Sequence, residues 1–224
     1  MRKMMRQLSR VGLLLGALVG SAFAQPAPLA ADTAESERLI VFLGDSLSAG
    51  LGVESSEAFP ALIAQRIRAG HLPFQVENAG VSGDTTAGGL RRIDWLLQRK
   101  IDVLVIELGA NDGFRGLTLT EMKKNLQAII TKARTKNSGV KIVLAGMQIP
   151  PNLGADYATK FRQVYVEIAK ENNVTLIPFL LDGVGGHADL NQSDMIHPTA
   201  EGHCVVAGVV WKTLEPILRE IATR

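Results

Sequence analysis

The sequence predicts an α/β domain built on a five-stranded parallel sheet with helices on both faces. Five short apolar runs alternate with segments in which apolar residues recur at helical spacing, and that alternation is typical of parallel sheets. The runs lack polar alternation, as expected of strands covered on both faces. The length of 224 residues suits one domain, and a hydrophobic fraction of 46% is enough for its core.

The first 24 residues are predicted to be a secretory signal. Four basic residues precede an apolar run over 11–19, which is too short to span a bilayer. The small residues of Ser21-Ala22-Phe23-Ala24 indicate cleavage after Ala24, and hence a periplasmic or secreted protein without stable membrane insertion. A membrane anchor is the alternative. A Pro- and Ala-rich leader over 25–37 then precedes a domain over 38–224.

Charge and cysteine content exclude a nucleic-acid-binding protein and a protein with internal disulfides. Removing the four basic residues of the signal leaves 20 of the 24 basic residues against 22 acidic ones, a balance that excludes nucleic acid as a partner. Cys204 is the only cysteine, so an internal disulfide is impossible. Its apolar neighbours Val205 and Val206 predict that Cys204 is buried.

The domain begins with a strand and a helix. Residues 39–43 form an apolar run of strand length, which Gly44-Asp45 ends just before Ser46. Ser55-Ser56-Glu57 predicts the start of a helix, and Gly70 ends its apolar pattern.

Two more strands and a second helix come next. The strand 74–77 ends at Asn78-Ala79-Gly80, and the loop 81–86 caps a helix that extends to Leu97. The run 103–106 is the clearest buried strand.

A third helix begins at Thr120-Glu121, whose side chains are typical of a helix start, and the fourth strand covers 140–145. Prolines exclude a helix from the loop 147–153. Apolar spacing over 161–168 predicts the fourth helix.

The chain ends with a strand, a long loop and a helix. The fifth strand covers 174–177, the loop runs from 178 to 198, and the last helix covers about 199–222.

Several polar residues follow these strands at one edge of the sheet. Ser46, Gly80 and Asn111 follow the first, second and third strands, and Asp194 and His197 lie in the loop after the fifth. Ligands of open parallel sheets bind at the carboxyl ends of the strands. We therefore expect these five residues to lie close together.

Three of these residues could form a nucleophilic site. Ser46 is the candidate nucleophile, and it needs a neighbouring base. His197 could be that base, because Asp194 three residues earlier can bind its Nδ1 and fix the tautomer. The alternative is that Asp194 caps a helix that begins near Pro198. No spacing typical of a metal site and no cofactor motif occurs, so we predict neither.

Acyl transfer also needs donors for the negative charge that develops on the carbonyl oxygen. The candidates for this oxyanion hole are the Ser46 amide, the backbone at Gly80 and the side-chain amide of Asn111. Taken singly, Gly80 and Asn111 are explained as well by ordinary turns. Their occurrence after successive strands favours the functional interpretation.

Four blocks of the sequence resemble those of the GDSL, or SGNH, hydrolase superfamily. The blocks are Gly44-Asp45-Ser46-Leu47-Ser48, Gly80, Gly109-x-Asn111-Asp112 and Asp194-x-x-His197-Pro198. The resemblance implies a flavodoxin-like, three-layer α/β/α sandwich. It also implies that Ser46 is the nucleophile, His197 the base and Asp194 its orienting residue, with Ser46, Gly80 and Asn111 forming the oxyanion hole. Ala110 and Met195 stand where such relatives often have glycine.

The resemblance implies an exported serine hydrolase that cleaves carboxylic esters and thioesters of the arylesterase, acyl-CoA thioesterase or lysophospholipase type. The acyl chain would contact apolar residues at the active edge: Phe114, Leu117, Met147, Ile149, Pro150, Pro151 and Leu153. A carbohydrate acetylesterase is the alternative within the enzyme class, and a non-catalytic lipid-binding domain is the alternative outside it. We expect a monomer whose partners are small acyl substrates.

Overall fold

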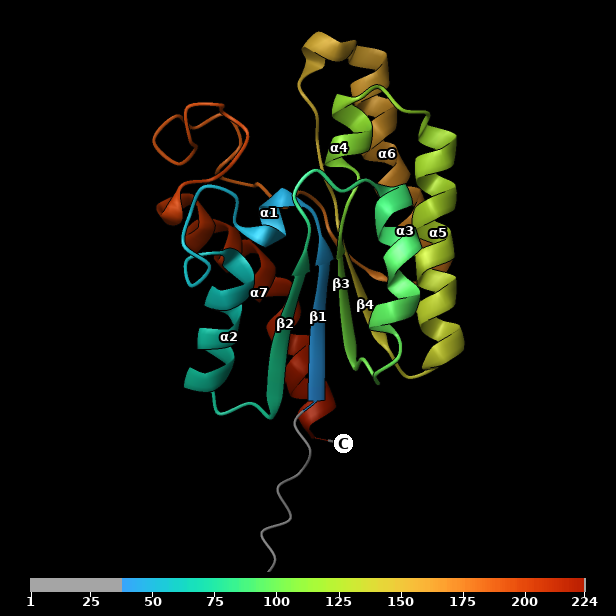
Figure 1. The fold of residues 1–224 in the computed structure, drawn as a ribbon, viewed down its shortest axis with the longest axis vertical. Coiled ribbons are helices and arrows are strands. Elements are labelled where there is room, and N and C mark those ends of the chain that lie inside the picture. Colours follow the sequence, from blue (N-terminus) through green and yellow to red (C-terminus); the bar gives the residue numbers. More distant parts are fainter. Residues whose placement is uncertain (1–37, 224) are drawn as a thin grey trace, which may run out of the picture. The chain divides into compact units, whose positions relative to one another are not determined.

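The structure is a computed structural model that describes residues 38–223. Five parallel strands form its centre (Figure 1). The strands are β1 (Arg38–Gly44), β2 (Phe74–Gly80), β3 (Val103–Glu107), β4 (Lys141–Ala145) and β5 (Thr175–Ile177). Their order is β2-β1-β3-β4-β5, which is the flavodoxin-like order of a doubly wound fold. The predicted fold class and all five predicted strands are confirmed, and the predicted signal and leader lie outside the described residues.

Helices cover both faces of the sheet. The helices are α1 (Ser46–Ala49), α2 (Phe59–Ala69), α3 (Thr86–Leu96), α4 (Ala110–Phe114), α5 (Leu119–Lys136), α6 (Ala155–Asn172) and α7 (Ala200–Ala222), with a 3-10 turn, η1, at Pro151–Leu153. Figure 1 shows α2 and α7 on one face and α3, α5 and α6 on the other, while α1 and α4 lie at the carboxyl ends of the strands. The sheet is therefore the middle of three layers.

Two helices begin at other residues than the sequence predicts. Helix α2 begins at Phe59 rather than near Ser55, because Pro60 lacks an amide hydrogen and fits only in the first turn of a helix. Helix α5 is capped by Thr118, whose Oγ1 accepts a hydrogen bond from the Glu121 amide at 3.4 Å. The prediction at Thr120 was wrong by two residues.

The prediction that Cys204 is buried was wrong, because its side chain is exposed on α7. The apolar face of this helix is formed by Val206, Ala207 and Val210, and His203 lies buried on the same side. The His203 Nδ1 accepts a hydrogen bond from the Phe59 amide at 3.3 Å, and burial lowers the pKa of this imidazole to about 4. His203 therefore packs α7 against α2 as a neutral side chain.

The order of the strands changes direction between β1 and β3, and this switch point is where ligands bind in such folds. Residues Leu39 to Leu43 are all buried, so the sheet holds the end of β1 in place. Ser46 follows β1 and Asn111 follows β3, so both residues lie at the switch point.

Candidate active site

Ser46 is the first residue of α1, and Asp45 alone separates it from the end of β1. Asp45 caps this short helix, and its Oδ1 accepts a hydrogen bond from the Leu47 amide at 3.0 Å. A Cβ on Gly44 would overlap Ser48 Oγ and lie 2.6 Å from Glu107 Oε2. Only glycine at position 44 therefore lets α1 fold back this tightly over the end of β3.

The structure brings Ser46, His197 and Asp194 together. His197 Nε2 lies 2.9 Å from Ser46 Oγ, and His197 Nδ1 lies 2.6 Å from Asp194 Oδ2. The other oxygen, Oδ1, accepts the backbone amides of Ile196 at 2.9 Å and His197 at 3.0 Å. Bonds from the His197 amide, the His197 ring and the Ile196 amide lower the pKa of Asp194 to about 2. Asp194 therefore stays ionised and can hold the ring of His197.

Met195 lies between these residues with a φ of +60°, in the left-handed region that favours glycine. This backbone turn lets Asp194 bind both the amide and the ring of His197. Glycine would adopt this φ without the steric cost that a side chain brings.

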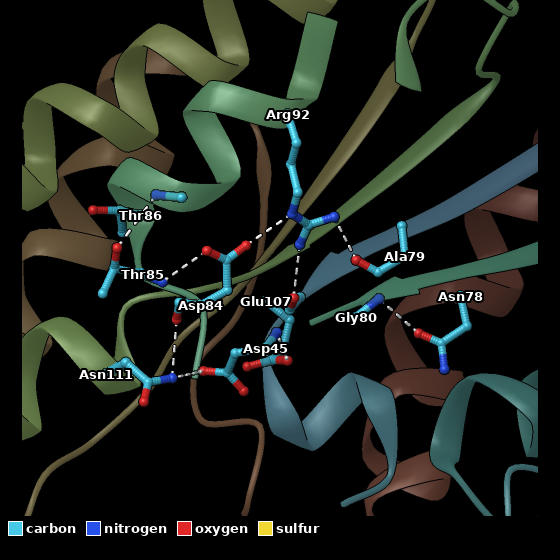
Figure 2. Close-up of polar contacts among 12 residues, drawn as sticks. Asp45, Asn78, Ala79, Gly80, Asp84, Thr85, Thr86, Arg92, Glu107 and Asn111 are labelled. Carbon is cyan, nitrogen blue, oxygen red and sulfur yellow. Dashed lines mark hydrogen bonds and ion pairs between the residues drawn. The ribbon is translucent and has the colours of Figure 1, made fainter. Parts of the chain in front are cut away.

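Asn111 lies at the start of α4, after β3. Its Nδ2 donates to Asp45 Oδ2 at 3.0 Å and to the Asp84 carbonyl oxygen at 2.9 Å. Figure 2 shows the Asn111 amide between Asp45 and the loop before α3. The amide therefore joins the β1 end of the switch point to this loop.

Arg92 of α3 holds the same loop against the sheet. Its Nε donates to Asp84 Oδ2 at 2.8 Å, its Nη1 to the Ala79 carbonyl oxygen at 2.6 Å and its Nη2 to the Gly44 carbonyl oxygen at 2.9 Å (Figure 2). One guanidinium group thus connects the ends of β1 and β2 to the residue whose carbonyl binds Asn111.

The structure does not support Gly80 as an oxyanion donor. Its amide already donates to Asn78 Oδ1 at 3.0 Å, as Figure 2 shows. A Cβ on Gly80 would lie 2.8 Å from the Ser48 carbonyl carbon, so packing of α1 explains the glycine. In the loop that follows, Ser82 and Gly83 are the residues whose amides have no acceptor within the described part of the chain.

A cavity of about 570 Å³ lies beside Ser46 and His197. Of the predicted acyl-contacting residues, Phe114, Met147, Ile149 and Pro150 line the cavity. Leu117 and Leu153 do not, and their side chains are exposed. The side chain of Pro151 lies outside the described part of the chain. Four further lining residues were not predicted from the sequence: Phe179, Leu181, Asn191 and Ile196. Because these residues lie in the irregular segment after β5, no periodicity marks them.

Comparisons with known proteins show the family of this chain. The model of the GDSL-like lipase/acylhydrolase family matches residues 42–205. The chain is 41% identical over 186 residues to esterase TesA of Pseudomonas aeruginosa, across 83% of this chain and 91% of that protein. It is 34% identical over 180 residues to thioesterase 1/protease 1/lysophospholipase L1 of Escherichia coli K12, across 80% of this chain and 84% of that protein.

The fold of the chain is also similar to that of a solved esterase structure. The psychrotrophic esterase EstA from Pseudoalteromonas sp., crystallised with monoethylphosphonate as inhibitor, matches with a TM-score of 0.77 and 32% identity. The match covers 81% of this chain and 99% of that one.

Proposed function

Because the chain belongs to the GDSL-like lipase/acylhydrolase family and is an ester-bond hydrolase, we propose that Ser46, His197 and Asp194 form its catalytic triad. The observation that carries this proposal is the continuous chain of hydrogen bonds from Asp194 through His197 to Ser46, at 2.6 and 2.9 Å. This is the arrangement that activates a serine hydroxyl.

In the first half of the reaction, Ser46 Oγ attacks the carbonyl carbon of the substrate while His197 Nε2 takes the hydroxyl proton. The ionised Asp194 stabilises the imidazolium ion and holds Nε2 toward the serine. The tetrahedral intermediate collapses as His197 protonates the leaving alcohol or thiol, which leaves an acyl group on Ser46. Water activated by His197 then releases the acid and restores Ser46.

For the oxyanion hole we retain the Ser46 amide and Asn111 Nδ2, and we replace Gly80 by Gly83. Gly83 precedes Asp84, whose carbonyl oxygen binds Asn111, and the Gly83 amide has no acceptor among the described residues. Both hydrogens of Asn111 Nδ2 already have acceptors, so the oxyanion would share one of them with Asp45 or Asp84.

We propose acyl esters and acyl thioesters as substrates. The cavity beside Ser46 is lined largely by apolar side chains and has a volume suited to an acyl chain longer than acetyl. Relatives of the chain are named as an esterase and as a thioesterase and lysophospholipase. A carbohydrate acetylesterase would not need this apolar cavity.

We also propose that the chain is exported after cleavage at Ala24 and acts as a monomer, as the sequence predicts. Among the described helices, none is long and apolar enough to cross a membrane. N-terminal sequencing of protein recovered outside the cytoplasm tests the cleavage site, and size-exclusion chromatography with light scattering tests the monomer.

Kinetics with nitrophenyl esters of increasing chain length test the function. Ser46→Ala and His197→Ala should each lower kcat by about three orders of magnitude or more while the protein stays folded. Exposed residues of the same types provide the matched controls Ser55→Ala and His187→Ala, which should retain full activity. Activity should rise with chain length beyond acetyl. Full activity of folded Ser46→Ala would refute the triad, and acetyl-only activity would favour the carbohydrate acetylesterase.

A further inference from the structure

Glu107, the last residue of β3, is completely buried directly behind the nucleophile. Its Oε2 accepts hydrogen bonds from Ser48 Oγ at 2.8 Å, the Asp45 amide at 3.1 Å and the Ser48 amide at 3.2 Å. These three donors belong to the turn that presents Ser46. One oxygen of Glu107 is therefore fully used in holding that turn.

The other oxygen, Oε1, is buried and accepts no hydrogen bond from any described residue. A buried ionised carboxylate with an unpaired oxygen is costly, because nothing replaces the water it loses. The buried carboxyl of Asp45 is the neighbouring titratable group: the Asp45 amide donates to Glu107 Oε2, and each carboxyl shifts the pKa of the other. Two ionised carboxylates cannot bond each other, but one proton between them lets one donate to the other.

The donors around the pair decide which group keeps that proton. Asp45 receives hydrogen bonds on both of its oxygens, from the Leu47 amide and from Asn111 Nδ2, and these favour its ionised form. Glu107 receives its bonds on Oε2 alone, which leaves Oε1 free to carry a proton. Burial, and then the charge of Asp45, raise the pKa of Glu107 well above 4.5, whereas burial raises that of Asp45 only to about 6.

The other charged and titratable groups near the pair have partners of their own. The Tyr165 hydroxyl of α6 donates to the Leu108 carbonyl oxygen, Asp112 of α4 accepts from Thr86, and Arg92 of α3 binds Asp84 and two carbonyl groups. His197 binds Ser46 and Asp194. No cation or hydroxyl among these described groups pairs with Glu107 Oε1.

We propose that Glu107 is a positioning residue that acts as a neutral acid, donating a hydrogen bond from Oε1 to Asp45. Asp45 in turn holds the Asn111 amide and caps the helix that begins with Ser46. Glu107 thereby fixes two elements of the site without touching the substrate. The effect on catalysis rests on the proposed function, whereas the protonation state does not.

The first test compares Glu107→Gln with Glu107→Leu. Glutamine reproduces the neutral acid, because its amide nitrogen can donate to Asp45 while its oxygen accepts the three donors of the turn. Glu107→Gln should keep kcat and KM within about threefold of the parent, whereas folded Glu107→Leu should lose about tenfold or more in kcat with little change in KM. Glu54→Gln, on an exposed side chain, is the matched control and should change neither value. A loss of kcat in folded Glu107→Gln as large as that in Glu107→Leu would overturn the proposal.

The second test measures stability against pH and needs no activity. A proton that the folded state holds more tightly than the unfolded state makes stability fall as pH rises from about 4.5 through the folded pKa of Glu107. Glu107→Gln has no such proton to lose. The melting temperature of Glu107→Gln minus that of the parent should therefore increase as pH rises from 5 to 9. The Glu54→Gln control should follow the parent. A constant or declining difference for Glu107→Gln would overturn the proposal.

A third readout observes the carboxyl group directly and decides the matter if Glu107→Leu does not fold. The ¹³C resonance of the Glu107 carboxyl, assigned by its absence from Glu107→Gln, should show the protonated form at pH 6. A titration with a midpoint near the ordinary value of 4.5 would overturn the proposal. If the Ser46→Ala variant remained active while this resonance stayed protonated, the proposed triad would fail and the assignment for Glu107 would stand.

Discussion

Replacing Arg92 by alanine should loosen the loop that holds Asn111. The guanidinium makes three hydrogen bonds, to Asp84 Oδ2 and to the carbonyl oxygens of Ala79 and Gly44. After its removal the Gly44 carbonyl keeps the Val81 amide as a donor, and Asp84 Oδ1 keeps the Thr85 amide. The main losses are therefore the cation beside Asp84 and the donor to Ala79.

The size of the effect follows from these partners. The side chains of Arg92 and Asp84 are 23% and 11% exposed, so water replaces only part of the lost interaction. A hydrogen bond to a charged group contributes about 1.5–3 kcal/mol. With two such interactions lost and partly replaced, the free energy of unfolding should fall by about 2–4 kcal/mol. A displaced loop should also lower kcat by about tenfold or more, because Asn111 is held by the Asp84 carbonyl group.

Urea denaturation and ester hydrolysis measure both effects. The neighbouring Arg91 is exposed on the same helix, so Arg91→Ala is the matched control for loss of charge and helix context. Arg92→Lys keeps the charge but cannot reach three acceptors, and it should lie between the parent and Arg92→Ala. An unfolding free energy for Arg92→Ala within about 0.5 kcal/mol of that for Arg91→Ala would refute the reasoning.

Three further substitutions have outcomes that follow from the site. Met195→Gly should raise the free energy of unfolding, measured by urea denaturation, by about 0.5–1 kcal/mol. The steric strain of a positive φ, which glycine removes, is larger than the conformational entropy that glycine adds to the unfolded chain. A loss of stability would contradict this. Asp194→Asn should lower kcat by about 10²–10⁴-fold. Because the pKa of Asp194 is lowered on folding, the parent should lose more thermal stability than this variant as pH falls from about 4 to about 2, and equal acid sensitivity would contradict this. Gly44→Ala should cost about 1–3 kcal/mol in chemical denaturation, because its Cβ would meet Ser48 and Glu107, and an unchanged midpoint would show that α1 can shift.

The strands could be predicted from the sequence because each is a short apolar run, and their alternation with helices gives a parallel sheet. The short helices α1 and α4 could not, because segments of four and five residues are too short for the helical period to repeat. The exposure of Cys204 depends on which face of α7 meets the sheet. Apolar neighbours on both sides of Cys204 do not reveal that face.

The site could be predicted in part for a related reason. Ser46, Asp194 and His197 have side chains whose chemistry is visible in the sequence. Two of the three proposed oxyanion donors are backbone amides, and which amide is free depends on turns and packing. The sequence therefore pointed to Gly80, although its amide is already bound to Asn78. Glu107 was missed because it ends a buried strand, although a single acid directly after four apolar residues is a signal that could have been noticed.

The most direct test of the central proposal is labelling with a fluorophosphonate probe followed by peptide mass mapping. Such probes react with an activated serine, so we predict a single adduct on Ser46 that is absent from His197→Ala and present in His187→Ala. An adduct on another residue, or no adduct on a folded protein, would contradict the assignment of Ser46 as the nucleophile.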